Sequence, residues 1–528
     1  MRRCDVAIIG SGFAGSLLAR VLATLGRDVV LVERGTHPRF AIGESTTPLA
    51  NLSLERIACR YGLRDCYDLA AHGRWVERLP QLRRGLKRGF TFYRHHPGEV
   101  LAGRDGERLL VAASPNAHVA DSHWLRADVD HHFVRAAQYA GVDYMDRLEL
   151  TTCAFSVSGA RLRGMRDGES VELAAPFVID ASGPGGFLAR QLGIPSAIER
   201  TFTRSSLLFS HFEGVREISE LLPGMQEGPY PDDWAAMHHV IDEGWMYSLR
   251  FDDGVVSAGV VSRESAGRSG PVESGRREPT ADMRWRQVVA RYPTIDAAFA
   301  DARPTMPVKY VPLIQHRLAR AAGDRWLLMP HAFAFVDPLF STGIAWALRA
   351  VERIALMFEN SRLPSRGDLS RYDALLSREG DQIDRLVAGA YHAMPHFEAF
   401  VAQALIYFAA VSYAETRQRV APGDDVAWSG FLGIGDDALE HVIPESHDRL
   451  RRLDPHHASD RQGFVEWATQ AIAPRNIAGF ADPARHNLYP LDVDMLVDRH
   501  DLLGLSRDQL VAALPTLRGM DGAAAALG

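Results

Sequence analysis

The sequence of 528 residues contains few cysteines and no excess of basic side chains. The cysteines Cys4, Cys59, Cys66 and Cys153 include no CxxC pair, so they predict neither a disulfide framework nor a metal site. Acidic side chains outnumber basic ones by 66 to 59, which gives a formal net charge of −7. Nucleic-acid-binding surfaces are normally basic, so this balance argues against a nucleic-acid partner.

The sequence also lacks a long uninterrupted apolar run. The most apolar stretch with helical spacing, residues 397–413, contains Glu398 and Gln403 and falls short of the roughly 20 apolar residues that span a bilayer. Near the N-terminus an apolar run follows two arginines, but Asp5 interrupts it and a glycine-rich turn comes directly afterwards, unlike a signal peptide. We therefore expect a cytoplasmic protein without membrane contact.

Lysine is scarce. Only Lys87 and Lys309 occur, and arginine supplies the rest of the 59 basic residues. A coding bias explains the excess of arginine. Under such a bias a remaining lysine is expected where arginine cannot replace it, because a desolvated ammonium group can lose its proton whereas a guanidinium group cannot. Both lysines are therefore candidate functional residues.

The beginning of the chain has a dinucleotide-binding pattern. An apolar strand is predicted over residues 4–9, and Gly10, Gly12 and Gly15 follow it in GxGxxG spacing. A helix and a second strand come next, and that strand ends at Glu33. In such a unit the glycines let a pyrophosphate approach the helix N-terminus, and the acid binds a ribose hydroxyl. The pattern predicts a dinucleotide site, with a purely structural tight turn as the alternative.

Two later segments favour FAD as the dinucleotide. The first places an apolar strand before Asp180 and a glycine-rich turn; the second places a strand before a turn at Asp337 and a helix from about Thr342. This order resembles that of flavoprotein hydroxylases with the glutathione-reductase-like fold. By this resemblance Arg126, at the start of an amphipathic helix, approaches the flavin. The alternative for Arg126 is a solvated helix charge.

The rest of the chain shows two kinds of hydrophobic pattern. Short alternating segments between residues 191 and 304 predict antiparallel strands, and apolar residues after residue 350 recur at helical spacing. The predicted fold class is α/β plus α: a Rossmann-like FAD-binding domain, an antiparallel sheet region for the substrate and a C-terminal helical region. The expected bounds are 1–75, 115–190 and 305–360 for the FAD-binding domain, 76–114 and 191–304 for the sheet region, and 361–528 for the helical region.

Three short segments carry groups that could perform chemistry. GESTTP, residues 43–48, offers polar side chains in a turn; Lys87 precedes a strand-like alternation of aromatic residues; and Ser341, Thr342 and Gly343 open a helix. Free N–H groups at a helix start bind anions, either a halide or flavin oxygens. Taken singly, a proline-capped turn explains the first segment and a solvated basic loop the second.

In combination these segments resemble flavin-dependent halogenases, notably the branch that acts on phenols and pyrroles. The resemblance is carried by the order GxGxxG, GESTTP, Lys-x-Gly-x-x-Phe at residues 87–92 and DPLFSTGIA at residues 337–345. It implies that a separate flavin reductase supplies FADH2, which with O2 oxidises chloride or bromide to hypohalous acid. A lysine then delivers the halogen to a small aromatic substrate, either free or bound to a carrier protein.

The resemblance gives each matching residue a role. Lys87 is expected to be the catalytic residue, and Ser341, Thr342 and Gly343 are expected to bind halide. An amine suits Lys87 because an ammonium group polarises hypohalous acid and a desolvated neutral amine accepts the halogen. The residues expected to bind FAD are Gly10, Gly12, Phe13, Ala14, Gly15, Glu33, Arg34, Ser45, Thr46, Arg126, Asp337, Gly343 and Ile344.

Two positions depart from the family pattern. Phe340 stands where tryptophan halogenases have glutamate, which favours a phenol or pyrrole over free tryptophan. The segment that corresponds to the family's WxWxIP motif keeps Trp245 but has Arg250 in place of proline. This leaves open an FAD-dependent aromatic monooxygenase on the same fold. A non-catalytic flavoprotein that docks a carrier protein is a further alternative.

Aromatic and histidine side chains elsewhere have two interpretations. His95 and His96 either assist a phenol or are exposed loop residues, and at most one can face a site because neighbours on a strand point in opposite directions. A second set, in the helical region, either lines an aromatic substrate pocket or packs the core. Its members are Tyr391, His392, Met394, Phe397, Phe400, Phe408 and Tyr413.

Overall fold

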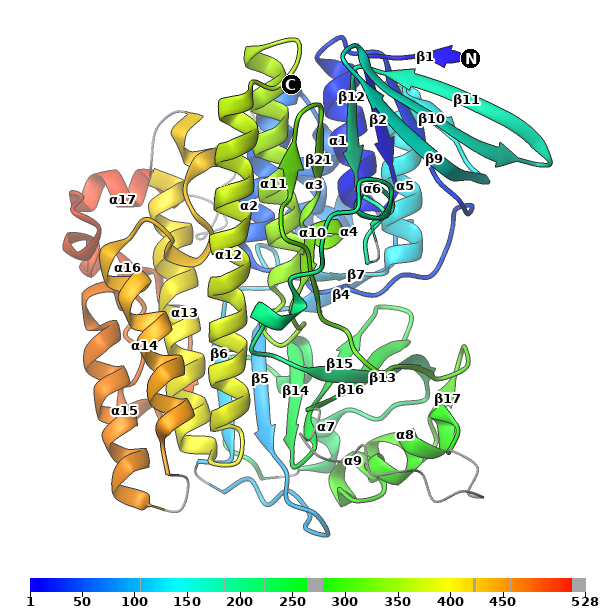
Figure 1. Ribbon diagram of the computed structural model, residues 1–528. Helices are drawn as coiled ribbons and strands as arrows, with labels where there is room; N and C mark the ends of the chain where they lie inside the picture. The colour runs from blue at the N-terminus through cyan, green and yellow to red at the C-terminus, as the bar shows by residue number, and fades with distance from the viewer. Residues whose placement is uncertain are drawn as a thin grey trace.

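The computed structural model describes residues 1–104, 106–184, 186–222, 224–263, 279–420, 424–454 and 457–514. Two main sheets lie one above the other, and a layer of long helices runs alongside both (Figure 1). The predicted fold class, a Rossmann-like domain with an antiparallel sheet region and a C-terminal helical region, is confirmed.

The first sheet has six strands in the order β20-β21-β12-β2-β3-β8. The five strands from β21 to β8 are parallel, and β20 pairs antiparallel at the edge. Every residue of β2 and β3 is buried, as expected for a parallel sheet covered on both faces. The strands are β2 (Val6–Ile9), β3 (Val29–Val32), β8 (Asp143–Met145), β12 (Phe177–Asp180), β20 (Ala322–Gly323) and β21 (Trp326–Leu328).

A four-stranded sheet extends from this domain, with the order β1-β11-β10-β9. Leu162 pairs with both Leu173 and Cys153, and these three side chains are buried, so one face of the sheet contributes to the core. Its strands are β1 (Arg2–Arg3), β9 (Leu148–Ser156), β10 (Gly159–Arg166) and β11 (Glu169–Ala175).

The second main sheet has the order β17-β13-β16-β15-β14-β5-β6-β23, and β18 also pairs with β13. Most of its pairs are antiparallel, but β14 runs parallel to β5 and β23 parallel to β6. Lys309–Val311, inside the third range expected for the FAD-binding domain, belongs to this sheet. The strands are β5 (Gly89–Arg94), β6 (Arg108–Ala112), β13 (Ser205–Glu213), β14 (Ala236–Ile241), β15 (Gly244–Arg250), β16 (Val256–Arg263), β17 (Arg303–Pro304), β18 (Lys309–Val311) and β23 (Leu488–Tyr489).

A short antiparallel pair lies between the two main sheets (Figure 1). It consists of β4 (Arg84–Lys87) and β7 (Asp121–Trp124), and it places Lys87 directly opposite Asp121. A separate antiparallel pair consists of β19 (His316–Arg317) and β22 (Ala334–Phe335).

The helices begin and end at recognisable signals. Pro48 occupies the first turn of α2, where proline is tolerated, and Gly62 ends that helix at a φ of +68°. Ser365 and Asp368 form a capping box at the start of α12. The long helices are α1 (Phe13–Thr24), α2 (Pro48–Tyr61), α5 (Arg126–Tyr139), α11 (Thr342–Asn360), α12 (Arg366–Ala393), α13 (Phe397–Val420), α14 (Asp437–Arg452) and α15 (Ala458–Ile472). The shorter helices are α3 (Arg64–Leu69), α4 (His72–Arg78), α6 (Phe187–Gln191), α7 (Ile218–Leu221), α8 (Ala281–Val289), α9 (Pro293–Phe299), α10 (Pro330–Phe333), α16 (Val493–Asp498) and α17 (Arg507–Ala513).

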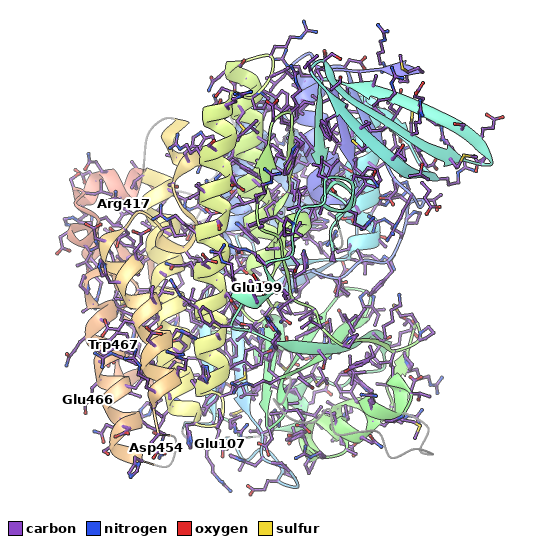
Figure 2. The ribbon with its side chains drawn as sticks, viewed as in Figure 1. Glu107, Glu199, Arg417, Asp454, Glu466 and Trp467 are labelled. Atoms are coloured by element: carbon purple, nitrogen blue, oxygen red, sulfur yellow. The ribbon has the colours of Figure 1, made fainter. Side chains whose placement is uncertain are left out.

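Helix α13 forms the centre of the helical layer. It packs against α12, α15 and α2, which explains why it is apolar on all sides. Within the described chain it is long and apolar enough to cross a membrane by composition alone, but 83% of its most apolar window is buried inside the protein. α15 lies at the outer edge of the layer, where Figure 2 shows Glu466 and Trp467.

A buried ion pair joins the helical layer to the Rossmann-like domain. Arg353 of α11 donates hydrogen bonds of 2.8 and 2.6 Å to the two oxygens of Glu379 of α12, and both side chains are 0% exposed. The Trp346 indole and the Phe431 backbone N–H also donate to this carboxylate, each at 2.8 Å. Buried charges are tolerated when they are paired and hydrogen-bonded in this way.

Candidate active site

Three glycines shape the turn between β2 and α1, and they do so for different reasons. Gly10 has a φ of +102°, and a Cβ atom there would lie 2.5 Å from the carbonyl oxygen of Ala181. A Cβ atom on Gly15 would lie 2.1 Å from the carbonyl oxygen of Gly10. The fold itself therefore requires glycine at both positions. A Cβ atom on Gly12 would make only ordinary van der Waals contacts, at 3.7–4.0 Å, with Arg126, Asp130 and Arg39, so the fold itself does not require glycine there.

Glu33 presents a buried carboxylate beside this turn, at the end of β3. It accepts hydrogen bonds from the Ser11 backbone N–H at 3.2 Å, the Ser11 hydroxyl at 2.9 Å and the Gly35 N–H at 3.0 Å. Burial raises the pKa of the Glu33 carboxyl, but the Gly35 N–H and the Arg39 charge outweigh burial and lower it overall. The carboxylate, the glycine at position 12, which the fold does not require, and the start of α1 at Phe13, which has no side-chain cap, fit a dinucleotide.

Arg126 is buried rather than solvated, contrary to the alternative considered from the sequence. Its guanidinium donates to both oxygens of Asp130, at 2.8 and 2.9 Å, and to the carbonyls of Ile42 and Gly43, at 2.9 and 3.1 Å. It also lies 4.8 Å from the centre of the Phe13 ring. Arg126 thereby holds the start of the GESTTP segment against the beginning of α1.

Two of the segments predicted to be functional meet at the start of α11. Ser341, at a φ of +52°, precedes the helix, and its hydroxyl donates to the Ser45 hydroxyl at 3.1 Å. Thr342 is 6% exposed. A Cβ atom on Gly343 would lie 2.9 Å from His331 Nε2, a buried nitrogen that forms no hydrogen bond within the described chain. The absence of a side chain at Gly343 therefore lets the His331 ring lie directly against the backbone of α11.

Asp337 fixes the turn that leads to this helix. One of its oxygens accepts from the Leu339 N–H at 3.0 Å, and the other from the Ser205 and Tyr391 hydroxyls at 3.0 and 2.9 Å. The Tyr391 oxygen in turn accepts from the Trp245 indole at 3.0 Å. Burial raises the pKa of Asp337 to about 7. Sequence reasoning missed this network because its members come from separate segments.

Lys87 is completely buried at the end of β4. Its ammonium donates to the Thr46 carbonyl at 2.5 Å and lies 4.0 Å from the centre of the Phe90 ring. Burial lowers the pKa of Lys87 and raises the pKa of Asp121, while the opposite charges of the two groups act against both shifts. Since Thr46 follows Ser45, the segment of these two residues links the start of α11 to the Lys87 amine.

Aromatic side chains surround the Lys87 region. The Phe90 and Phe408 ring centres are 5.3 Å apart, and the Phe92 and Phe400 ring centres 5.4 Å apart, so β5 packs against α13. Phe340 stacks on Tyr407 with a separation of 4.4 Å.

His95 lies away from this aromatic cluster. Its ring is 1% exposed and forms a hydrogen bond of 2.9 Å with His239. The interpretation of His95 as an exposed loop residue is therefore wrong. His95 follows β5 directly, and its backbone N–H donates to the Val240 carbonyl at 3.0 Å, so it is held beside the end of β14 and is buried there.

The structure adds polar residues near Lys87 that the sequence reasoning did not select. Asp121 accepts a hydrogen bond of 2.8 Å from Asn51 at one oxygen, and its other oxygen is buried without a partner in the described chain. His123 is 0% exposed, and neither of its ring nitrogens has a hydrogen-bond partner among the described residues. The polar run DSHW at residues 121–124, inside a strand where apolar residues are the rule, was the available signal.

Comparison with known proteins identifies the family. The family model described as tryptophan halogenase matches residues 112–401, more than half of the chain, and the model described as NAD(P)-binding Rossmann-like domain matches residues 8–64. The chain is similar to tetracycline 7-halogenase of Kitasatospora aureofaciens, with 30% identity over 65% of this chain and 61% of that protein. It is also similar to monodechloroaminopyrrolnitrin halogenase PrnC of Pseudomonas fluorescens, with 27% identity over 64% of this chain and 59% of that protein. The chain thus spans about three fifths of the length of these curated relatives.

A solved structure shares the fold. The crystal structure of halogenase PltM in complex with phloroglucinol and FAD superposes with a TM-score of 0.83 at 22% identity, covering 92% of this chain and 99% of that chain. The family match covers the strand that contains Asp121, the strands β13 to β18 of the second main sheet and the start of α11. The chain therefore belongs to the tryptophan halogenase family of flavin-dependent halogenases.

Proposed function

We propose that this chain is an enzyme that uses FADH2, O2 and chloride or bromide to halogenate an electron-rich aromatic compound of the phenol or pyrrole type. The observation that carries the proposal is the completely buried Lys87 amine, bonded to Thr46 next to the residue that contacts the start of α11. Removing an amine from water costs free energy, so a catalytic role explains why the chain keeps a lysine at this buried position. The buried Phe340, at the position of the tryptophan-halogenase glutamate, supports a phenol or pyrrole over free tryptophan.

The Rossmann-like domain, expected over residues 1–75, 115–190 and 305–360 and here without the sheet strand Lys309–Val311, would hold FAD. The turn from Gly10 to Gly15 would receive the pyrophosphate, and Glu33 would bind a ribose hydroxyl. When bound, reduced FAD supplies, with O2, the oxidising power that converts halide to hypohalous acid. Arg126 would keep the loop over this site in place through Ile42 and Gly43.

The start of α11 would hold the halide. α11 has 19 residues, and the free N–H groups at Thr342 and Gly343 carry the positive end of its dipole. Because Thr342 is buried, few water molecules compete for the anion. The network of Asp337 with Ser205 and Tyr391 would keep this turn in place.

Lys87 would receive the oxidised halogen after it passes Ser45 and Thr46. As an ammonium, it would donate a hydrogen bond to hypohalous acid and polarise it; as a neutral amine, it would accept the halogen. Because burial lowers the pKa of Lys87, both forms are accessible near neutral pH. Arginine would not serve, since a guanidinium does not deprotonate in proteins.

Replacing Gly12 by alanine is expected to weaken FAD binding by at least about tenfold, or about 1.4 kcal/mol, without lowering the folding stability. The new Cβ atom would meet no protein atom within 3.7 Å, and the φ of −65° suits alanine. The space that it occupies is the one assigned to the cofactor. A fluorescence titration with FAD measures the affinity, and thermal unfolding measures the stability.

The matched control for this variant is Gly463→Ala, at an exposed glycine inside α15 where a Cβ atom has no neighbour within 4 Å. It should leave FAD binding unchanged. Wild-type affinity in the Gly12→Ala variant would contradict the assignment of the turn.

The decisive experiment for the activity is a halide-dependence assay. The protein is incubated with FAD, a flavin reductase with NADH, O2 and a panel of phenols and pyrroles, with bromide, chloride or neither. Mass spectrometry is expected to show halogenated products only when halide is present. Oxygenated products without halide would instead support the monooxygenase, and no turnover with retained FAD would support the non-catalytic alternative.

The same assay tests the separate reductase as a partner. Chemically reduced FAD should replace the reductase and NADH, because the chain is proposed to use FADH2 made elsewhere. NADH with FAD but without a reductase should give no product.

A further inference from the structure

We propose that His123 is a catalytic residue that holds hypohalous acid by hydrogen bonding while it passes from the start of α11 to the Lys87 amine. This inference rests on the proposed halogenase function and adds to it the residue that keeps the oxidised halogen from escaping. It stands on the position of His123 in the strand pairing, on its unpartnered ring nitrogens and on the chemistry of a neutral imidazole.

The GESTTP segment extends the β4–β7 pair by a third strand. Ser45 forms an antiparallel bridge with His123, and two backbone hydrogen bonds of 2.6 and 3.2 Å between the same two segments flank this bridge. In a pair flanked in this way the Cα atoms lie about 4.5 Å apart and both side chains point to the same face. The Ser45 hydroxyl and the His123 imidazole are therefore neighbours.

The same face carries Lys87. Asp121 lies two residues before His123 on β7, so its side chain points to the same face, and Lys87 is directly paired with Asp121. The Lys87 side chain starts on β4, but its ammonium donates to the carbonyl of Thr46, which lies on the far side of β7. The amine therefore crosses β7 on the face that carries His123.

This face also reaches the start of α11. The Ser341 hydroxyl donates to the Ser45 hydroxyl at 3.1 Å, and Thr342 and Gly343, which are proposed to bind halide, follow Ser341 directly. His123 therefore lies between the turn that is proposed to hold the halide and the amine that is proposed to receive the halogen.

The His123 ring lacks partners of its own. It is 0% exposed, and neither nitrogen forms a hydrogen bond within the described chain. Burial and the Lys87 charge lower the pKa of His123 to about 3, and the Ala235 carbonyl opposes this shift. A single carbonyl can engage only one of the two nitrogens. Because buried polar atoms in folded proteins nearly always have a partner, the ring indicates a small bound molecule.

A neutral imidazole matches hypohalous acid. The ring has one N–H donor and one acceptor nitrogen, and hypohalous acid has one O–H donor and lone pairs on its oxygen. The molecule has only one heavy atom more than water, so it needs little more room than a water molecule that would satisfy the ring. The oxygen–halogen bond stays intact at His123 and breaks only when the Lys87 amine takes the halogen.

The test compares wild type, His123→Phe and His123→Gln in single turnovers with chemically reduced FAD, halide, O2 and an aromatic substrate. Taurine in the solution traps hypohalous acid that escapes, as a haloamine. Phenylalanine fills the space without a polar atom, so halogenated product per flavin should fall at least about tenfold, as for the loss of a buried hydrogen-bond partner in an active site. Trapped haloamine should rise by the amount of product lost. Glutamine keeps a donor and an acceptor, so His123→Gln should retain at least about a third of the product.

His95→Phe is the matched control. His95 is also almost completely buried, and it is bonded to His239 away from the Lys87 region. His95→Phe should leave product per flavin at the wild-type value, although it removes a buried hydrogen bond. Thermal unfolding of each variant measures the accompanying change in stability.

A crystal structure of the wild-type protein provides a second readout, which requires no variant to fold. It should show a water molecule within about 3.2 Å of a His123 ring nitrogen. Ring nitrogens bonded only to protein atoms would overturn the inference.

The outcomes separate this inference from the proposed function. Wild-type product per flavin in His123→Phe would overturn the role of His123 alone. A lower product yield without more trapped haloamine, or equal losses in His123→Phe and His123→Gln, would overturn it as well. No halogenated product in wild type from any aromatic compound would overturn the proposed function.

Discussion

Replacing Lys87 by methionine is expected to lower the yield of halogenated product by at least about 100-fold while the protein stays folded and still binds FAD. Methionine is unbranched and adaptable, so it should fill the buried space beside Phe90. It lacks the amine that is proposed to polarise hypohalous acid or accept the halogen. Catalytic groups of this kind commonly contribute factors of about 10² or more. Mass spectrometry of the product, with O2 consumption measured in parallel, should show continued consumption without halogenation.

The chain contains a matched control for this variant. Lys309 is the other lysine, and it is exposed at the edge of the second main sheet. Lys309→Met should halogenate at the wild-type rate. Lys87→Arg should fail like Lys87→Met, because it keeps the positive charge but cannot lose its proton. Wild-type halogenation by Lys87→Met would remove the amine from the mechanism.

Replacing Glu379 by glutamine is expected to lower the free energy of unfolding by about 3–5 kcal/mol. The change removes the negative charge that is paired with the buried Arg353 guanidinium. The Trp346 indole and the Phe431 N–H can still donate to the glutamine oxygen, which is a weaker acceptor than the carboxylate. Since whole domains are marginally stable by about 5–15 kcal/mol, this loss should shift the urea midpoint visibly. Circular dichroism followed during urea titration measures it.

A surface ion pair provides the comparison. Arg378 and Glu440 are paired between α12 and α14, and their side chains are 57% and 30% exposed. Exposed pairs contribute about 0–1 kcal/mol, so Arg378→Gln should lower the free energy of unfolding by no more than that. If Glu379→Gln and Arg378→Gln lowered the free energy of unfolding equally, the larger contribution expected of the buried pair would be contradicted.

The parts of the site that could be predicted from the sequence are those set by local chain geometry. The glycines of the β2–α1 turn and the acid at Glu33 lie within one βαβ unit, so spacing alone predicted their arrangement. Lys87 stood out because lysine is rare in this chain. The FAD-binding part of the fold class followed from the GxGxxG unit and the resemblance to flavoprotein hydroxylases, and the sheet and helical regions followed from the change between strand-like and helix-like periodicity.

The parts that could not be predicted depend on contacts between distant segments. The Asn51–Asp121 hydrogen bond joins residues 70 positions apart, and the Trp245–Tyr391 bond residues 146 positions apart. No local periodicity encodes such pairs. Asp337 illustrates the difference: its place in a turn before a helix was predicted, but its partners Ser205 and Tyr391 were not.

The hydrogen bonds from Trp245 to Tyr391 and from Tyr391 to Asp337 matter for any attempt to re-engineer this protein. They connect α12 to the turn that precedes α11, so the helical layer cannot be exchanged without affecting that turn. A chimera that borrows this layer from another protein would disturb the turn before α11, which is proposed to bind halide, unless the graft keeps a tyrosine at position 391. Single substitutions are therefore less disruptive to this protein than the exchange of whole segments.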